Sequence, residues 1–341
     1  MDAAVGAGVL AAVRWTWPGR ELWDVVAALG WAGAAAAWAA LVLAVSRLVQ
    51  APLSCWRGWW RERRWGFSTQ SLRGWLADQG KELAVSVVFL AGAWTGAVGL
   101  ARALPGWWAV PAAAGAALAV LLLSFVAPVL LEPLFNRFRP LADEALAAEL
   151  RALAERAGVP VRDVLVADAS RRTTKLNAYV SGIGSTRRVV VFDTLLEAVD
   201  VGALRSVVAH ELGHRRERDV VKLTAAGMAC AVAAVALVWA VLGTRVASPR
   251  ELPVALLLLA AFQVVAMPFG AAWSRRLERR ADRWSLELTH DLAAFERAHL
   301  DLARRNLADL APPRLAYLFL STHPTPRERL AAARDWAAAR A

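Results

Sequence analysis

Five long apolar segments constrain the fold of this chain more than any other feature of its 341 residues. Each is long enough to cross a lipid bilayer, which takes roughly 20 apolar residues in a helix. A backbone inside the bilayer must satisfy its own hydrogen bonds, so these segments have to be helical. The expected spans are approximately 22–49, 82–104, 107–131, 221–243 and 252–273. The 58% hydrophobic composition likewise indicates a mainly α-helical, polytopic membrane protein.

A shorter apolar run at residues 3–13 precedes the first expected span. It is too short to be counted as a span, and it lacks the basic start of a cleaved signal peptide. Whether residues 3–17 cross or re-enter the membrane stays open, so the total is five spans or six.

The formal net charge of +11 comes from 40 basic residues, of which only 3 are lysine. Basic residues concentrate between the first two spans and directly after the fifth. They are Arg57, Arg61, Arg63, Arg64, Arg73 and Lys81, followed by Arg275, Arg276, Arg279 and Arg280. The positive-inside rule makes this side cytoplasmic, with the N-terminus outside and the C-terminus inside. The basic charge therefore indicates membrane topology, and a nucleic-acid partner is not expected.

Tryptophan and cysteine usage also fits a membrane protein. Many of the 17 tryptophans lie near the ends of the expected spans, which is typical of an interfacial aromatic belt. The two cysteines, Cys55 and Cys230, are isolated in the sequence. They supply neither a disulfide framework nor a pair of metal ligands.

The spans divide the chain into four regions. These are an N-terminal membrane region (1–131) with an Arg/Trp-rich loop (50–80), a polar and candidate catalytic region (132–220), two spans (221–273) and a helical C-terminal segment (274–341). The polar region has α+β patterning. We expect a helix over 142–157, strands over 163–166, 176–180 and 189–192, a hairpin turn over 181–185, and a helix capped by Asp200.

The helix after Asp200 contains the pattern His-Glu-x-x-His at residues 210–214. His210 and His214 lie one helical turn apart on one face, so their rings can reach one zinc ion. Glu211 then lies beside the ion, where it can transfer a proton. We expect this helix to run on into the fourth span. A zinc hydrolase also needs a third protein ligand and one open position for water.

Glu278 is a candidate third ligand, because it follows the fifth span on the same expected side. Asp282 is four residues later on the same helix face and could accept an N–H from a ligating histidine. Each pattern alone has a simpler explanation. His-Glu-x-x-His occurs by chance on polar helix faces, and Glu278 could merely pair with neighbouring arginines. The residues alone therefore leave the zinc site open.

Several motifs together narrow the choice. They are GFSTQ at 66–70, EPLFNRF at 132–138, NAY at 177–179, FDTLL at 192–196, HELGH at 210–214, SRRLERRAD at 274–282, STHP at 321–324 and ERL at 328–330. With them the chain resembles the integral-membrane zinc metalloproteases of the CAAX prenyl endopeptidase family, gluzincins related to bacterial heat-shock membrane proteases. The resemblance covers about residues 60–335.

The resemblance implies a role for each matching residue. His210, His214 and Glu278 would hold one zinc ion, with Asp282 behind them, and Glu211 would be the general base. Three further positions, Asn177, His323 and Arg329, would hold substrate and stabilise the oxyanion. The strand that carries Asn177 could also pair with an extended substrate peptide.

The chain departs from the family pattern at three places. Eukaryotic members have more spans than the five or six expected here, which leaves the size of any enclosed chamber open. Residues 173–176 (TTKL) replace a Ser/His-rich approach to Asn177, and Arg279-Arg280 replaces an aromatic residue followed by glutamine. These changes spare the expected zinc ligands and bear on substrate choice.

The leading hypothesis is a zinc metalloendopeptidase in the membrane (the plasma membrane in a bacterium) with its site facing the cytoplasm. Its substrates would be peptides or membrane-associated proteins, including lipidated ones, and the bilayer would be a further partner. C-terminal processing and protein quality control both stay open. An inactive scaffold of the same fold is the alternative, but the presence of Glu211 argues against it. A transporter is disfavoured because the spans carry almost no ionisable residues.

Overall fold

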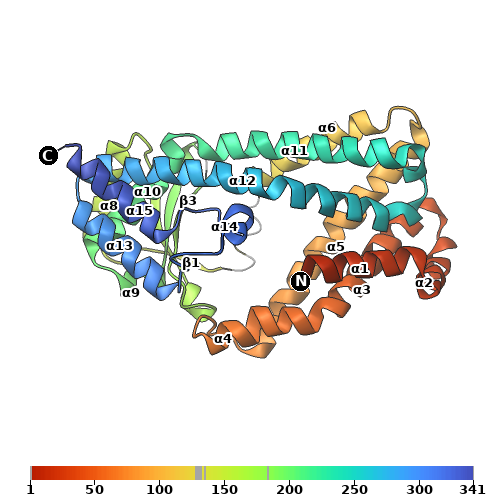
Figure 1. Ribbon diagram of the computed structural model, residues 1–341, viewed down its shortest axis with the longest axis horizontal. Helices are drawn as coiled ribbons and strands as arrows, with labels where there is room; N and C mark the ends of the chain where they lie inside the picture. Colours follow the sequence, from red (N-terminus) through yellow and green to blue (C-terminus); the bar gives the residue numbers. More distant parts are fainter. Residues whose placement is uncertain (1, 127–132, 134–135, 183, 341) are drawn as a thin grey trace. The chain divides into compact units, whose positions relative to one another are not determined.

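The computed structural model describes residues 2–126, 133, 136–182 and 184–340 (Figure 1). Its contacts divide the chain into two compact units. Unit 1 comprises Met1–Trp65, Gln70–Leu122 and Ala225–Val265, and unit 2 comprises Gly66–Thr69, Leu123–Thr224 and Ala266–Ala341. Some predictions lie outside the described residues. These are the end of the third span (127–131), motif residues Glu132, Leu134 and Phe135, and Ile183 of the expected turn.

Unit 1 is entirely helical. It contains α1 (Asp2–Trp15), α2 (Trp17–Ala27), α3 (Gly30–Cys55), the π-helix η1 (Trp56–Arg61), α4 (Glu62–Arg64), α5 (Leu72–Ala103), most of α6 (Ala109–Val126), most of α11 (Asp219–Leu242), the 3₁₀ turns η5 (Gly243–Ala247) and η6 (Pro249–Glu251), and the start of α12 (Leu252–Thr289). Large side chains such as Trp38, Val98 and Leu252 are fully buried in its core. Glu251 is buried between Arg14 and Arg245, at 3.0 Å from a guanidinium nitrogen of each.

Among the described residues, five helical segments are long and apolar enough to cross a membrane, which confirms the predicted number. They are Gly30–Arg64, Leu72–Ala103, Ala109–Val126, Asp219–Ala247 and Pro249–Thr289. The N-terminal apolar helix is a shorter element and is not one of them. The predicted start of the first span at residue 22 is wrong. The helix is interrupted at residues 28–29, so residues 22–27 belong to the separate helix α2.

Unit 2 combines a small sheet with helices. Its elements are β1 (Phe138–Pro140), α8 (Glu144–Arg156), β2 (Asp163–Ala167), the 3₁₀ turn η3 (Ala169–Arg171), β3 (Ala178–Ser181), the 3₁₀ turn η4 (Gly184–Thr186), β4 (Arg188–Phe192), α9 (Asp193–Ala198), α10 (Val201–Arg216), the end of α12, α13 (Leu292–Arg305), α14 (Arg314–Leu320) and α15 (Pro326–Ala338). The strand order is β1-β2-β4-β3, and only β2 and β4 run parallel. The three predicted strands are confirmed within two residues at each end, and β1 is an addition.

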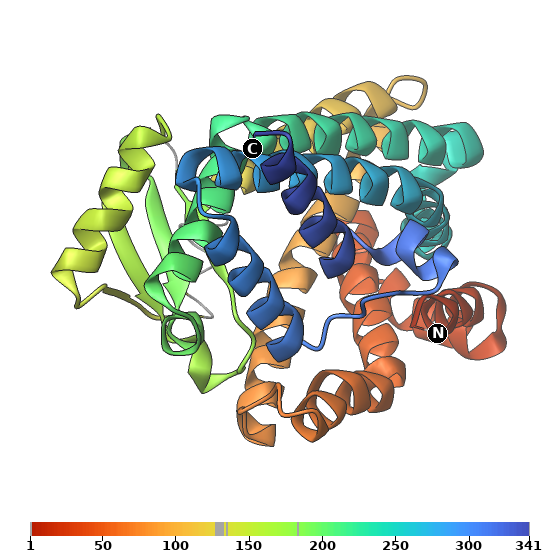
Figure 2. The ribbon, with the colours of Figure 1, turned by 60° about the vertical axis from the view of Figure 1, so that its left-hand side comes forward.

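One face of the sheet forms the core of unit 2. Valines of β2 and β4 pack there against α8 and α10. Figure 2 shows the ribbon of this sheet and its helices from a second side. On α10 the inward residues are Leu204, Val208 and Leu212, whose spacing of four places them on one helical face. Asp200 caps this helix as expected, accepting from the backbone N–H of Ala203 at 2.8 Å. The sheet therefore fixes the rotation of α10 about its axis.

The expected continuation of α10 into the fourth span is wrong. Helix α10 ends at Arg216 and α11 begins at Asp219. Between them Arg218 has φ 56°, in the left-handed region. A right-handed helix cannot pass through such a residue, so the chain starts a new helix there.

The strain at Arg218 can be tested with a matched pair of glycine substitutions. Arg218→Gly should leave the thermal unfolding temperature unchanged or raise it, because glycine adopts positive φ without steric cost. Arg276→Gly, at an exposed position inside α12, should lower stability by about 1 kcal/mol. Thermal unfolding of both variants in the same detergent measures the contrast. Equal destabilisation would contradict a strained Arg218.

Candidate metal centre

Helix α10 presents both histidines of the His-Glu-x-x-His motif on one side. The Nε2 atoms of His210 and His214 lie 3.2 Å apart. Only 11% and 20% of their side chains are exposed. The packing of α10 on the sheet thus directs two imidazole nitrogens to the same point.

Helix α12 supplies the third group, and Gly213 allows it to approach α10. A Cβ at Gly213 would lie 3.0 Å from Trp284 Cβ and 3.3 Å from Ala281 Cα, closer than ordinary van der Waals contact. At this approach Glu278 Oε2 lies 3.3 Å from His210 Nε2, and Glu278 Oε1 lies 3.3 Å from His214 Nε2. Among the described residues, these three side chains form the one cluster of three or more His, Cys, Asp or Glu residues that could hold a metal ion.

The separations fit a tetrahedral metal. Ligand atoms at about 2.0–2.1 Å from a tetrahedral zinc ion are roughly 3.3–3.4 Å from one another. The observed separations of 3.2, 3.3 and 3.3 Å match that edge length. Two imidazoles and one carboxylate also leave a fourth position for water, as a catalytic site requires.

Each histidine has a carboxylate at its other ring nitrogen. The predicted partner Asp282 places Oδ1 2.9 Å from His210 Nδ1. His214 has an equivalent partner that the sequence analysis missed, since Asp219 Oδ2 lies 3.0 Å from its Nδ1. Asp219 is buried and receives hydrogen bonds from Arg280 Nη2 at 2.7 Å and Lys222 Nζ at 3.2 Å. Such partners fix the ring orientation and leave Nε2 free for a metal.

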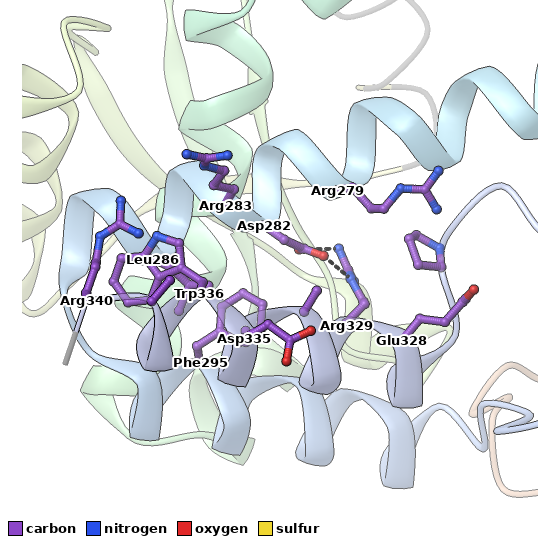
Figure 3. Close-up of a pocket in the computed structure, with 14 residues that line it drawn as sticks. Arg279, Asp282, Arg283, Leu286, Phe295, Glu328, Arg329, Asp335, Trp336 and Arg340 are labelled. Carbon is purple, nitrogen blue, oxygen red and sulfur yellow. Dashed lines mark hydrogen bonds and ion pairs between the residues drawn. The ribbon is translucent and has the colours of Figure 1, made fainter.

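Arg329 of α15 holds the second carboxylate of α12. Its Nε and Nη2 each donate to an oxygen of Asp282 at 2.7 Å, the two-bond contact drawn with dashed lines in Figure 3. Nη2 also lies 3.1 Å from Glu278 Oε2. His299 lies behind Arg329 and Asp282, with its Nδ1 3.5 Å from Arg329 Nη1. No sequence motif pointed to this histidine.

A pocket of about 360 Å³ opens over this centre. The predicted residues Asn177, Glu211 and His323 line it together with His210, Glu278 and Arg329. His323 is 61% exposed and places Nε2 3.4 Å from Glu278 Oε1. All eight residues singled out in the sequence therefore lie in or directly beside one site.

The charges in this site shift the pKa values of its side chains. Burial raises the pKa of Glu211, which suits a group that must accept a proton. Burial opposes a charge on His210, but the carboxylates of Asp282 and Glu278 outweigh it and raise the pKa to about 9. The pKa of His214 is also raised: burial opposes its charge, and hydrogen bonds to Glu278 and Asp219 favour it. Burial and the nearby Arg329 lower the pKa of His299 to about 3, so it stays neutral.

The chain matches two protein-family models that together cover most of its length. Residues 140–337 match peptidase family M48, and residues 7–137 match the CAAX prenyl protease N-terminal region, described as five membrane helices. The chain belongs to peptidase family M48. These matches confirm the family resemblance. They also confirm that the chain belongs to a metalloprotease family and is an integral membrane protein. Membership implies a metal ion and a peptide or protein substrate.

Individual relatives agree with the family models. The metalloprotease YhfN of Bacillus subtilis is 29% identical over 309 residues, which are 84% of this chain and 70% of YhfN. CAAX prenyl protease 1 of Saccharomyces cerevisiae is 29% identical over 184 residues, 54% of this chain but only 41% of the yeast protein. The fold resembles the crystal structure of S. mikatae Ste24p, with a TM-score of 0.78 and 23% identity over 92% of this chain and 79% of that one.

The raised histidine pKa values predict that metal binding releases protons. Without metal, His210 holds its proton at any pH below about 9, whereas a metal ligand must be deprotonated. Metal affinity should therefore increase as the pH rises toward 9. Calorimetric titration of the metal-free protein in buffers of different ionisation enthalpy measures the protons released. Identical apparent enthalpies in all buffers at pH 7 would contradict this prediction.

Proposed function

We propose that this protein is a zinc-dependent membrane endopeptidase whose zinc is held by His210, His214 and Glu278. The single observation that carries the proposal is the triangle of ligand atoms with tetrahedral spacing, flanked by Glu211. The chain retains the ligands and the base together, which argues against an inactive scaffold.

The protein side chains would have separate roles in the proposed reaction. Zinc, when bound, would acidify a water molecule and polarise the scissile carbonyl. Glu211 would take the proton of the attacking water and pass it to the leaving amine. Its raised pKa brings proton uptake closer to neutral pH. Asp282 and Asp219 would keep the two imidazoles turned with Nε2 toward the centre.

Asn177 and His323 are suited to bind the substrate carbonyl. Both line the pocket beside Glu211, and both carry N–H groups that can face a developing negative charge. The contacts of Arg329 indicate a main role other than binding the substrate carbonyl. Two of its nitrogens bind the carboxylates of Asp282 and Glu278, so we propose that it chiefly positions them.

Strand β3 lies at the end of the sheet and offers an edge for an extended peptide. Two neighbours occupy parts of this edge. Asn306 Oδ1 accepts from Leu176 N at 3.1 Å, and Arg215 Nε donates to Val180 O at 3.1 Å. Ala178 lies between them and also lines the pocket. We therefore expect substrate main chain to pair at Ala178, next to Asn177.

The substrates we propose are peptides or membrane-associated proteins, lipidated ones included, cut at the cytoplasmic face. The basic segments around 57–81 and 275–280 support this orientation by the positive-inside rule. We also propose that residues 274–341 complete the catalytic region 132–220, because they supply Glu278, His323 and Arg329.

Two substitutions separate catalysis from metal binding. Glu211→Gln should keep about one zinc per chain and abolish peptide cleavage, because the amide cannot accept the proton. Glu278→Ala should lower the zinc content itself, because it removes a ligand. Elemental analysis and a peptide cleavage assay on the same detergent-purified samples make the comparison. Cleavage that persists in Glu211→Gln would exclude the mechanism, and full zinc occupancy in Glu278→Ala would remove Glu278 from the ligand set.

Asp219 can be tested against a neighbouring acid. Asp219→Asn should weaken zinc affinity roughly 10–100-fold, the usual effect of losing a ligand's orienting carboxylate. Glu217→Gln is the control, since Glu217 also pairs with Arg280 and Lys222, whereas the carboxylate at His214 Nδ1 is that of Asp219. Competition with a chromophoric chelator measures both affinities. An equal loss of zinc affinity in the two variants would show that only the local charge affects zinc binding.

A further inference from the structure

The sequence from Trp56 to Trp65, called here the Trp/Arg segment, has no part in the proposed chemistry. Its ten residues, WRGWWRERRW, contain four tryptophans, four arginines and a single acid, Glu62. An ordinary interfacial belt explains scattered tryptophans at span ends. It does not explain this density or the arrangement of the side chains.

The segment follows the first span, whose stretch from Gly30 to Leu53 is apolar except for Ser46, Arg47 and Gln50 near its end. The stretch from Gly30 to Leu53 would be about 36 Å long at 1.5 Å per residue. The hydrocarbon core is about 30 Å thick, so a tilted helix completes its crossing just before Trp56. At that point α3 gives way to the π-helix η1 and then α4. We therefore infer that the Trp/Arg segment lies at headgroup level.

Three arginines of the segment lie over tryptophan rings of the preceding helical turn. A π-helix brings residues five apart into line, and Arg61 lies over the Trp56 ring at 6.0 Å. Two pairs four residues apart follow it. Arg63 lies 5.8 Å from the Trp59 ring and Arg64 lies 5.4 Å from the Trp60 ring. Three guanidinium groups thus lie within 6.0 Å of the centroid of an indole ring, which is the range of cation–π contacts.

The segment is also fastened to the start of α5, within the same unit. Trp59 Nε1 donates to the backbone oxygen of Gln70 at 3.0 Å. Trp75 of α5 packs on Gly58, where a Cβ would lie only 3.3 Å from the Trp75 Nε1 atom. The Trp/Arg segment is therefore a fixed platform, so its side chains lose little freedom on binding a ligand.

The outer side of this platform has apolar and cationic groups together. Trp56, Trp60 and Trp65 are 46%, 44% and 62% exposed, and Arg63 and Arg64 are exposed as well. Arg61 Nη2 lies 3.6 Å from Glu62 Oε1, and Arg63 Nη1 donates to Gln70 O at 3.4 Å. Each guanidinium has five N–H donors, so N–H groups remain that can bind a phosphate through two hydrogen bonds. The exposed indoles suit the boundary between headgroups and acyl chains.

We propose that the Trp/Arg segment is a binding site for the phosphate headgroup of anionic phospholipids. Charge complementarity and the position at the end of a span select this occupant over a soluble anion. The proposal goes beyond the proposed protease function and does not depend on it.

The test measures lipid binding to the full chain in detergent by native mass spectrometry. The wild type should prefer phosphatidylglycerol to phosphatidylcholine. The triple variant Arg61→Gln, Arg63→Gln, Arg64→Gln should lose roughly tenfold or more in phosphatidylglycerol affinity, since each basic residue near a lipid surface adds several-fold. The corresponding triple lysine variant should lose part of it, because an ammonium cannot stack and bind through two bonds.

The control triple Arg151→Gln, Arg156→Gln, Arg162→Gln removes the same charge from unit 2 and should bind like the wild type. Unchanged melting temperatures and zinc contents show that the variants are folded. No lipid preference in the wild type, or undiminished binding by the glutamine variant, would overturn the proposal. Undiminished binding by the lysine variant would show that positive charge alone explains the affinity. It would overturn the proposed role of the guanidinium geometry. Equal competition by free glycerol phosphate would show a soluble-anion site instead.

Discussion

The buried carboxylate of Glu278 is the group on which the rest of the site depends. A buried anion is costly unless other groups compensate its charge, and here the compensation comes from four side chains. His210 and His214 of α10, His323 before α15 and Arg329 of α15 all lie within 3.4 Å of its oxygens. One carboxylate therefore determines how the end of α12 must meet α10 and α15. The raised pKa of His210 shows that the surrounding carboxylates favour positive charge at this point, which is the condition for holding a metal cation.

Helical periodicity explains which parts of the site could be predicted from sequence. His210 with His214, and Glu278 with Asp282, are both pairs four residues apart, so each pair shares a face whatever the tertiary structure. Asn177, His323 and Arg329 have no such relation to the proposed metal ligands. Their positions in the pocket depend on how β3 and α15 pack, so only the resemblance to a family pointed to them.

The missed features have a different physical origin, because each follows from a local break in regular structure. Asp219 is five residues after His214, and in a continuous helix it would point away from the ring. The left-handed Arg218 ends α10 and turns Asp219 back, and composition does not signal that conformation. The interruption before Gly30 likewise separates α2 from an apolar run that is continuous in hydropathy. Strand β1 is three residues long and ends in proline, which is too short for an alternating pattern.

The preference for arginine over lysine has a structural reason in both units. In unit 2 a planar guanidinium binds two carboxylate oxygens of Asp282 at once, and Arg280 reaches the buried Asp219. In unit 1 the same planarity lets Arg61 and Arg64 lie on indole rings. A lysine ammonium would keep the charge in each case and lose the geometry. Of the 40 basic residues only 3 are lysine, and these contacts give arginine a structural role besides the membrane topology that its placement predicts. Arginine pairs with buried carboxylates in both units, and in unit 1 it also builds a cationic aromatic surface.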